Sequence, residues 1–95
     1  MRRIEIYGCS IERRLKSTLG RACKRNKGLY EAVIKKMDEV IKNPYHYKPL
    51  RHDLKGSKRV HIGKSYVLIF EIDETTKTIR FLDLGHHDEI YGKRR

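Results

Sequence analysis

The stretch LGHHDEIYG, at residues 84–92, gathers side chains that exchange protons near neutral pH. It holds two histidines, two acidic residues and a tyrosine, and it directly follows an apolar run. Histidine titrates close to the physiological range and can act as a general acid or as a general base. Three further histidines, His46, His52 and His61, lie earlier in the chain. These residues indicate proton-transfer chemistry if the fold brings some of them together.

The charge of the chain suggests the substrate. The sequence has 23 Lys and Arg against 12 Asp and Glu, a formal net charge of +11 over 95 residues. Such an excess costs self-repulsion and is typical of proteins that bind a polyanion. Nucleic acid, or an acidic protein that masks the surface, fits best. The plain alternative is a solvated, lysine-rich surface without a partner.

Residue periodicity predicts how the chain folds before these side chains are placed. Residues 2–7 alternate and predict a short strand. Ser10 is expected to cap a helix, and a second helix is expected over residues 29–42, ended by Asn43-Pro44. The first helix has an apolar stripe of Ile11, Leu15, Leu19, Ala22 and Cys23, and the second one of Tyr30, Val33, Met37, Val40 and Ile41.

Three strand patterns follow, at residues 59–62, 66–72 and 78–84, so the predicted order is β-α-α-β-β-β. We expect a single α+β domain over residues 1–95, with an antiparallel-rich sheet and both N-terminal helices packed on one of its faces. The chain has no apolar run of the ~20 residues that would cross a membrane and no signal-peptide pattern. We therefore expect a cytoplasmic protein. Cys9 and Cys23 lack metal-ligand spacing, so we expect no cofactor.

The strand at residues 59–62 predicts where a site would form. Val60 and Ile62 are expected to pack on the helices, so Arg59 and His61 would point to the opposite face of the sheet. Lys58 and Lys64 would flank them. Further polar groups leave the neighbouring strand or the loop that feeds the sheet, namely His52, His86, His87 and Tyr91. Together these side chains could hold and cut a phosphodiester.

The chemistry that these groups suit is RNA cleavage by the neighbouring 2′-hydroxyl. A base must remove the hydroxyl proton, an acid must protonate the leaving 5′-oxygen, and cations must stabilise the charge on phosphorus. Tyrosine can stack on an unpaired base. This chemistry needs no metal. A zinc site made by His52, His61 and His87 is the alternative, although no Cys or carboxylate completes a familiar spacing.

The segments NPYHYKPLRHDLKGS, RVHIGKSYVLIFEID and LGHHDEIYG, with this element order, resemble the RelE/ParE toxin superfamily over essentially the whole chain. The resemblance implies a RelE-like fold and a toxin that forms a hetero-oligomer with an acidic, RelB-like antitoxin. RelE-like members enter the ribosomal A site and cut mRNA there without a metal, leaving a 2′,3′-cyclic phosphate.

The histidine pattern is most similar to that of the YafQ branch. By this resemblance the functional histidines are His52, His61 and His87, and the aromatic residue of the ending is Tyr91. The acidic residue that the branch uses four positions after its second histidine falls on Ser65. An arginine that RelE-like members use falls on Val67. Activity would therefore be reduced or altered, with Asp53, Lys64 or Arg59 as substitutes.

The function predicted from the sequence is that of a ribosome-dependent mRNA endonuclease toxin. His87 is expected to be the general acid, and His61 or His52 the base or phosphate ligand. Arg59 and Lys58 would form an electrostatic clamp, with Tyr91 as a stacking platform. A basic helix would meet ribosomal RNA through Arg13, Arg14, Lys16 and Arg21. Two alternatives are a non-catalytic, ParE-like inhibitor of DNA gyrase and an RNA-binding module without nuclease activity.

Overall fold

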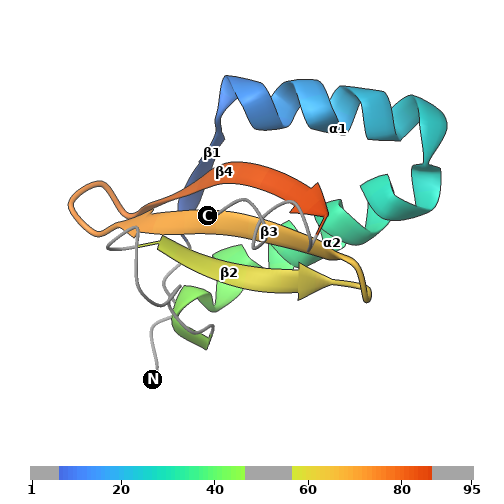
Figure 1. Cartoon of the computed structure of the whole chain (residues 1–95). Helices are drawn as coiled ribbons and strands as arrows, with labels where there is room; N and C mark the ends of the chain where they lie inside the picture. Colours follow the sequence, from blue (N-terminus) through green and yellow to red (C-terminus); the bar gives the residue numbers. More distant parts are fainter. Residues whose placement is uncertain (1–6, 47–56, 87–95) are drawn as a thin grey trace, which may run out of the picture.

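The structure, a computed structural model, describes residues 7–46 and 57–86. Their order is β1 (Gly8–Ile11), α1 (Arg13–Arg25), α2 (Lys27–Lys42), a 3-10 turn η1 (Pro44–His46), β2 (Ser57–Ile62), β3 (Tyr66–Asp73) and β4 (Thr78–His86). These strands form one sheet in the order β1-β4-β3-β2, with β1 parallel to β4 and the other neighbours antiparallel. The helices pack on one face of it (Figure 1), which confirms the predicted fold class.

The start of α1 differs from the prediction. Ser10 was expected to cap this helix, but it lies in β1, where it is paired with Arg80, and the N-cap residue is Glu12. Residues 8–11 extend along β4, so strand pairing takes precedence over the local helical pattern here. The predicted strand over residues 2–7 lies outside the described residues except for Tyr7. Cys23 is exposed rather than buried.

The rest of the helical pattern is confirmed. Leu15, Leu19 and Ala22 of α1 are buried, and so are Val33, Met37 and Val40 of α2. Asn26 separates the helices: its side-chain Oδ1 accepts a 3.1 Å hydrogen bond from the backbone N–H of Leu29 and so caps α2. Within the described ranges, the structure has no helix that is long and apolar enough to cross a membrane.

A bulge in β4 decides which side chains face the helices. Ile69 of β3 pairs with Asp83, whereas the next residue, Phe70, pairs with Phe81, so Leu82 is an extra residue on β4. Phe70 and Phe81 are fully buried, with their ring centroids 6.0 Å apart. Before the bulge the odd-numbered residues of β4 enter the core. After it the even-numbered ones do, beginning with Leu84, which is 6% exposed.

Deleting Leu82 should lower the free energy of unfolding by at least about 2 kcal/mol. The deletion would turn Leu84 out of the core, and burying one leucine fully stabilises a fold by ~1.5–3 kcal/mol. Urea denaturation measures the change. Leu82→Ala is the matched control, because it keeps the extra residue and therefore the register. Equal losses in the two variants would contradict this role of the bulge.

Candidate nucleic-acid and catalytic face

The sheet face opposite the helix-packed core is the candidate site, and we call it the second face. It is defined by alternation with the core residues along β2, β3 and β4. Its described members are Ser57, Arg59 and His61 on β2, Val67, Ile69 and Glu71 on β3, and Arg80, Asp83 and Gly85 on β4. In Figure 1 the strands β2 and β3 lie in front of α2, so the viewer looks toward this face.

The predicted alternation of β2 is confirmed. Val60 and Ile62 are buried in the helix-side core, at 7% and 3% exposure. Arg59 is half-buried and His61 is exposed, so both side chains leave β2 on the second face. Arg59 and His61, one pleat apart, therefore present a guanidinium and an imidazole from the same strand.

The centre of the second face is apolar. Val67 and Ile69 of β3 are buried, yet they are not part of the core cluster beneath the helices. Val67 is the direct cross-strand partner of His61, and Ile69 is that of Arg59. Directly opposed side chains on neighbouring strands have their Cβ atoms ~4.5–5.5 Å apart. The position at which the resemblance expects an arginine, Val67, therefore lies beside a predicted site histidine.

The two lysines that were predicted to flank Arg59 lie in different places. Lys58 alternates with Arg59 along β2, and its Nζ lies 5.5 Å from the ring centroid of Tyr45 in η1. Its side chain thus starts from the helix-side face. Lys64 is exposed in the turn between β2 and β3, after Gly63, whose φ of 64° suits glycine. Ser65 is exposed in the same turn.

The other end of the second face holds an ion cluster. The guanidinium of Arg80 donates to a carboxylate oxygen of Glu71 at 2.6 Å and to one of Glu12 at 3.2 Å. Both carboxylates raise the pKa of Arg80, with the hydrogen bond to Glu12 as the largest cause. The cluster joins β3, β4 and the residue that caps α1. We assign it a structural role, because its positive charge is matched by acids.

The basic surface of α1 lies along the outside of the molecule. All four predicted RNA-contacting residues are exposed: Arg13, Arg14, Lys16 and Arg21. The first turn of α1 has no acidic residue, although the helix dipole favours acids there. Arg14 lies 3.6 Å from Asp83 and connects the helix to the strand beyond the bulge. Cations at this helix end are unfavourable for the isolated helix, and the acidic N-cap residue Glu12 and Asp83 partly offset them.

Several predicted site residues lie outside the described part of the chain. These are His52, Asp53, His87 and Tyr91. Their meeting with His61 stays a prediction, and so does the zinc alternative, which uses the same histidines. His46 is described and lies in η1, with an exposed side chain.

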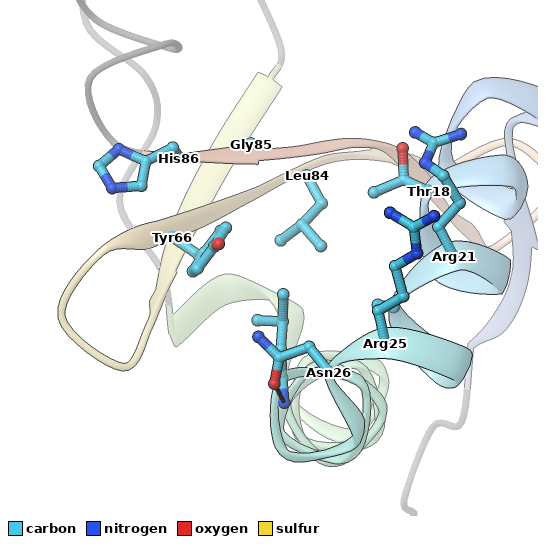
Figure 2. A pocket seen from close by; sticks show the side chains of 10 residues that line it. Thr18, Arg21, Arg25, Asn26, Tyr66, Leu84, Gly85 and His86 are labelled. Carbon is cyan, nitrogen blue, oxygen red and sulfur yellow. Dashed lines mark hydrogen bonds between the residues drawn. The ribbon is translucent and has the colours of Figure 1, made fainter.

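The sequence reasoning missed a pocket on the helix side of the sheet. Its volume is about 570 Å³, and its walls come from α1, the start of α2 and the ends of β3 and β4. Figure 2 shows Arg21 and Arg25 on one wall and Tyr66 and His86 on the other, with Leu84 between them. His86 reaches this pocket because the bulge reverses the alternation of β4. Local sequence carries no signal for that reversal.

Comparison with known proteins shows what the chain is similar to. Residues 11–91 match the family described as the ParE toxin of the type II toxin–antitoxin system parDE. A protein of Methanocaldococcus jannaschii is 48% identical over 90 residues, and its name is that of a toxin, RelE4. That match covers 95% of this chain and 96% of the relative.

Solved structures share the fold. A chain of the DinJ–YafQ complex of Escherichia coli has a TM-score of 0.72 at 23% identity, with 90% of this chain and 99% of that one covered. A chain of the RelBE2 toxin–antitoxin complex of Mycobacterium tuberculosis has a TM-score of 0.73 at 21% identity, with 86% and 99% covered. At these identities the likeness is one of fold.

The two faces of β2 should respond differently to substitution. Ile62→Ala is expected to lower the free energy of unfolding by about 2–5 kcal/mol, because it empties a core position. His61→Gln, one residue earlier, should change it by less than about 0.5 kcal/mol, because the side chain is exposed. Denaturant titration of both variants measures this. A loss for His61→Gln as large as that for Ile62→Ala would place His61 in the core and contradict the assignment.

Proposed function

The chain belongs to the RelE/ParE superfamily of toxins from type II toxin–antitoxin systems, and we propose that it acts by cutting mRNA on translating ribosomes. The observation that carries the proposal is the placement of His61 and Arg59 on the same face of β2, two positions apart. A titratable imidazole beside a fixed cation is what metal-free phosphodiester cleavage requires. The basic surface of α1 supports an RNA substrate.

In the proposed reaction the 2′-oxygen of RNA attacks the neighbouring phosphorus. His61 or His52 takes the 2′-hydroxyl proton or holds the phosphate, and His87 gives a proton to the leaving 5′-oxygen. The P–O5′ bond breaks as the P–O2′ bond forms, so the products are a 2′,3′-cyclic phosphate and a 5′-hydroxyl. No electron transfer is involved: the base gains the proton of the 2′-hydroxyl, and His87 loses one to the 5′-oxygen.

The remaining predicted residues hold the substrate. Arg59 stabilises the negative charge that grows on the non-bridging oxygens, and Tyr91 stacks on a base beside the cut. Lys64 attracts the strand from the turn after β2, whereas Lys58 starts from the helix-side face and takes no part in holding the strand. Ribosomal RNA is contacted by the exposed cations of α1, which are Arg13, Arg14, Lys16 and Arg21.

Two departures from the family pattern bear on the rate. Ser65 stands where the YafQ-like branch has an acid, and serine does not take a proton near neutral pH. Val67 stands where RelE-like members have an arginine, and it is the cross-strand partner of His61. Without that guanidinium, the charge on the phosphate is stabilised mainly by Arg59. We therefore propose a slower enzyme rather than an inactive one.

The proposed partner is an acidic antitoxin, with which the toxin forms a hetero-oligomer in the cytoplasm. Solved relatives of this fold include chains of complexes between RelB-type or DinJ antitoxins and their toxins. The net charge of +11 favours an acidic partner, because opposite charges steer association and mask the basic surface.

A second candidate function is inhibition of DNA gyrase without catalysis. It is favoured by the family match, whose description is that of a ParE toxin. The histidines argue against it, because the resemblance gives the ParE branch no such set. A plain RNA-binding module is the third candidate. A supercoiling assay with purified gyrase and a primer-extension assay on translated mRNA separate all three functions.

His87→Ala should remove most cleavage, by about 10²–10⁴-fold, because a positioned general acid contributes that much. Primer extension on translated mRNA measures the cuts, and expression in a growing culture measures toxicity. His46→Ala is the matched control, because it removes an imidazole that does not belong to the predicted set. The assignment of His87 fails if it and the control are equally active or equally inactive.

Ser65→Asp should raise the cleavage rate by about tenfold or more, because it restores a carboxylate to the turn after His61. Ser65→Asn has a similar shape without the basic oxygen and should leave the rate near that of the wild type. Single-turnover cleavage of translated mRNA compares the two. An equal rate for Ser65→Asp and Ser65→Asn would remove Ser65 from the account of activity.

A further inference from the structure

The pocket between the helices and the ends of β3 and β4 has the composition of a nucleotide site. Its floor is apolar, made by Ala22, Leu29 and Leu84. Its volume of about 570 Å³ lies within the ~300–1,000 Å³ range of small-ligand pockets. The wall formed by the strands is aromatic and the wall formed by α1 is cationic (Figure 2).

The cationic wall is made by Arg21 and Arg25, which are one helical turn apart on α1. Both are exposed, and the ion pairs of the described residues involve neither of them. Like charges at this spacing destabilise a helix by ~0.2–0.5 kcal/mol. The C-terminal dipole of α1 accounts for a cation at Arg25, but Arg21 lies a turn earlier. Two guanidinium forks on the same wall of the pocket suit a phosphate.

The aromatic wall is made by Tyr66 and His86. Their rings meet edge to face, with centroids 5.5 Å apart and an interplanar angle of 74°. Both side chains are half-buried and line the pocket. Tyrosine and histidine rings are common stacking surfaces for unpaired bases. Thr18 adds a hydroxyl group at the edge of the cationic wall.

We propose that this pocket binds one unpaired nucleotide of an RNA strand, with its phosphate between Arg21 and Arg25 and its base against Tyr66. The site lies on the helix side of the sheet, whereas Arg59 and His61 leave the second face. It is therefore a positioning site for RNA and takes no part in cleavage. An acidic peptide could match the arginines, but the aromatic pair favours a base.

The test measures binding of a labelled single-stranded oligoribonucleotide to the His87→Ala protein, so that cleavage does not enter. Arg21→Gln combined with Arg25→Gln should weaken binding by about tenfold or more. The binding constant should also become less sensitive to salt: the negative slope of its logarithm against log salt should become shallower by about 0.7 for each phosphate that the protein no longer neutralises. Tyr66→Leu should weaken binding by about tenfold with the salt slope unchanged.

Lys24→Gln combined with Lys35→Gln is the matched control. Both lysines are exposed helix residues outside the pocket lining, and the pair removes the same charge. We expect this pair to weaken RNA binding by less than about threefold, because it removes only non-specific electrostatic attraction. Circular dichroism and thermal unfolding verify that each variant is folded. For any variant that unfolds, titration of the His87→Ala protein with a 5′-nucleoside monophosphate should instead shift the NMR signals of the Tyr66 and His86 rings.

Four results would overturn the proposal. Equal losses in the arginine and lysine pairs would mean that only net charge matters. Unchanged binding by folded Tyr66→Leu, or unshifted ring signals with the mononucleotide, would remove the base from the pocket. If the Arg21→Gln and Arg25→Gln pair left RNA binding unchanged but weakened binding to the antitoxin, the pocket would be assigned to an acidic protein. Each result is independent of cleavage on ribosomes, so this site and the proposed nuclease can fail separately.

Discussion

The bulge at Leu82 is the constraint on which the two faces of the sheet depend. One extra residue in β4 lets Phe81 and Leu84 both enter the core, although they are three positions apart. The same residue directs Gly85 to the second face and His86 to the helix side. Adjacent residues at the end of β4 thus serve opposite faces, and each face has a different composition.

The distribution of charge follows the same division. At one end of the second face, the acids around Arg80 match its charge and join the start of α1 to the sheet. On β2 the cation is Arg59, beside an imidazole and an apolar centre. The exposed cations of α1 have few acidic neighbours, and Arg14 with Asp83 is one such pair. Charge that the fold neutralises supports structure, and charge that it leaves exposed is available to the RNA substrate that we propose.

Much of the fold could be predicted from the sequence because its elements have strong periodicity. The core stripe of α2, the alternation of Val60 and Ile62, and the position of β3 all follow from local patterns. The start of α1 could not be predicted, because Ser10 and Ile11 look like a helix cap and the start of a helical stripe but pair with β4. The bulge was also hidden, since FLDL, in which Asp83 lies among three apolar residues, can be read as part of a regular strand.

The candidate site was predictable only in part, for a related reason. The placing of Arg59 and His61 on one face needs only alternation along a single strand, and the structure confirms it. The placing of Lys58 on the opposite side follows from the same rule, although the sequence analysis grouped it with them. The pocket needs contacts among α1, β3 and β4, which no local pattern encodes. His52, His87 and Tyr91 lie outside the described residues, so their part in the site stays a prediction.

The central claim is that the chain cuts RNA by attack of the 2′-oxygen. Mass spectrometry of the mRNA fragments released from translating ribosomes tests it most directly. The account predicts fragments that end in a 2′,3′-cyclic phosphate, and no fragments when the nucleotide before the cut carries a 2′-deoxyribose. Fragments that end in a 3′-hydroxyl, or cutting that persists at the 2′-deoxy position, would contradict it.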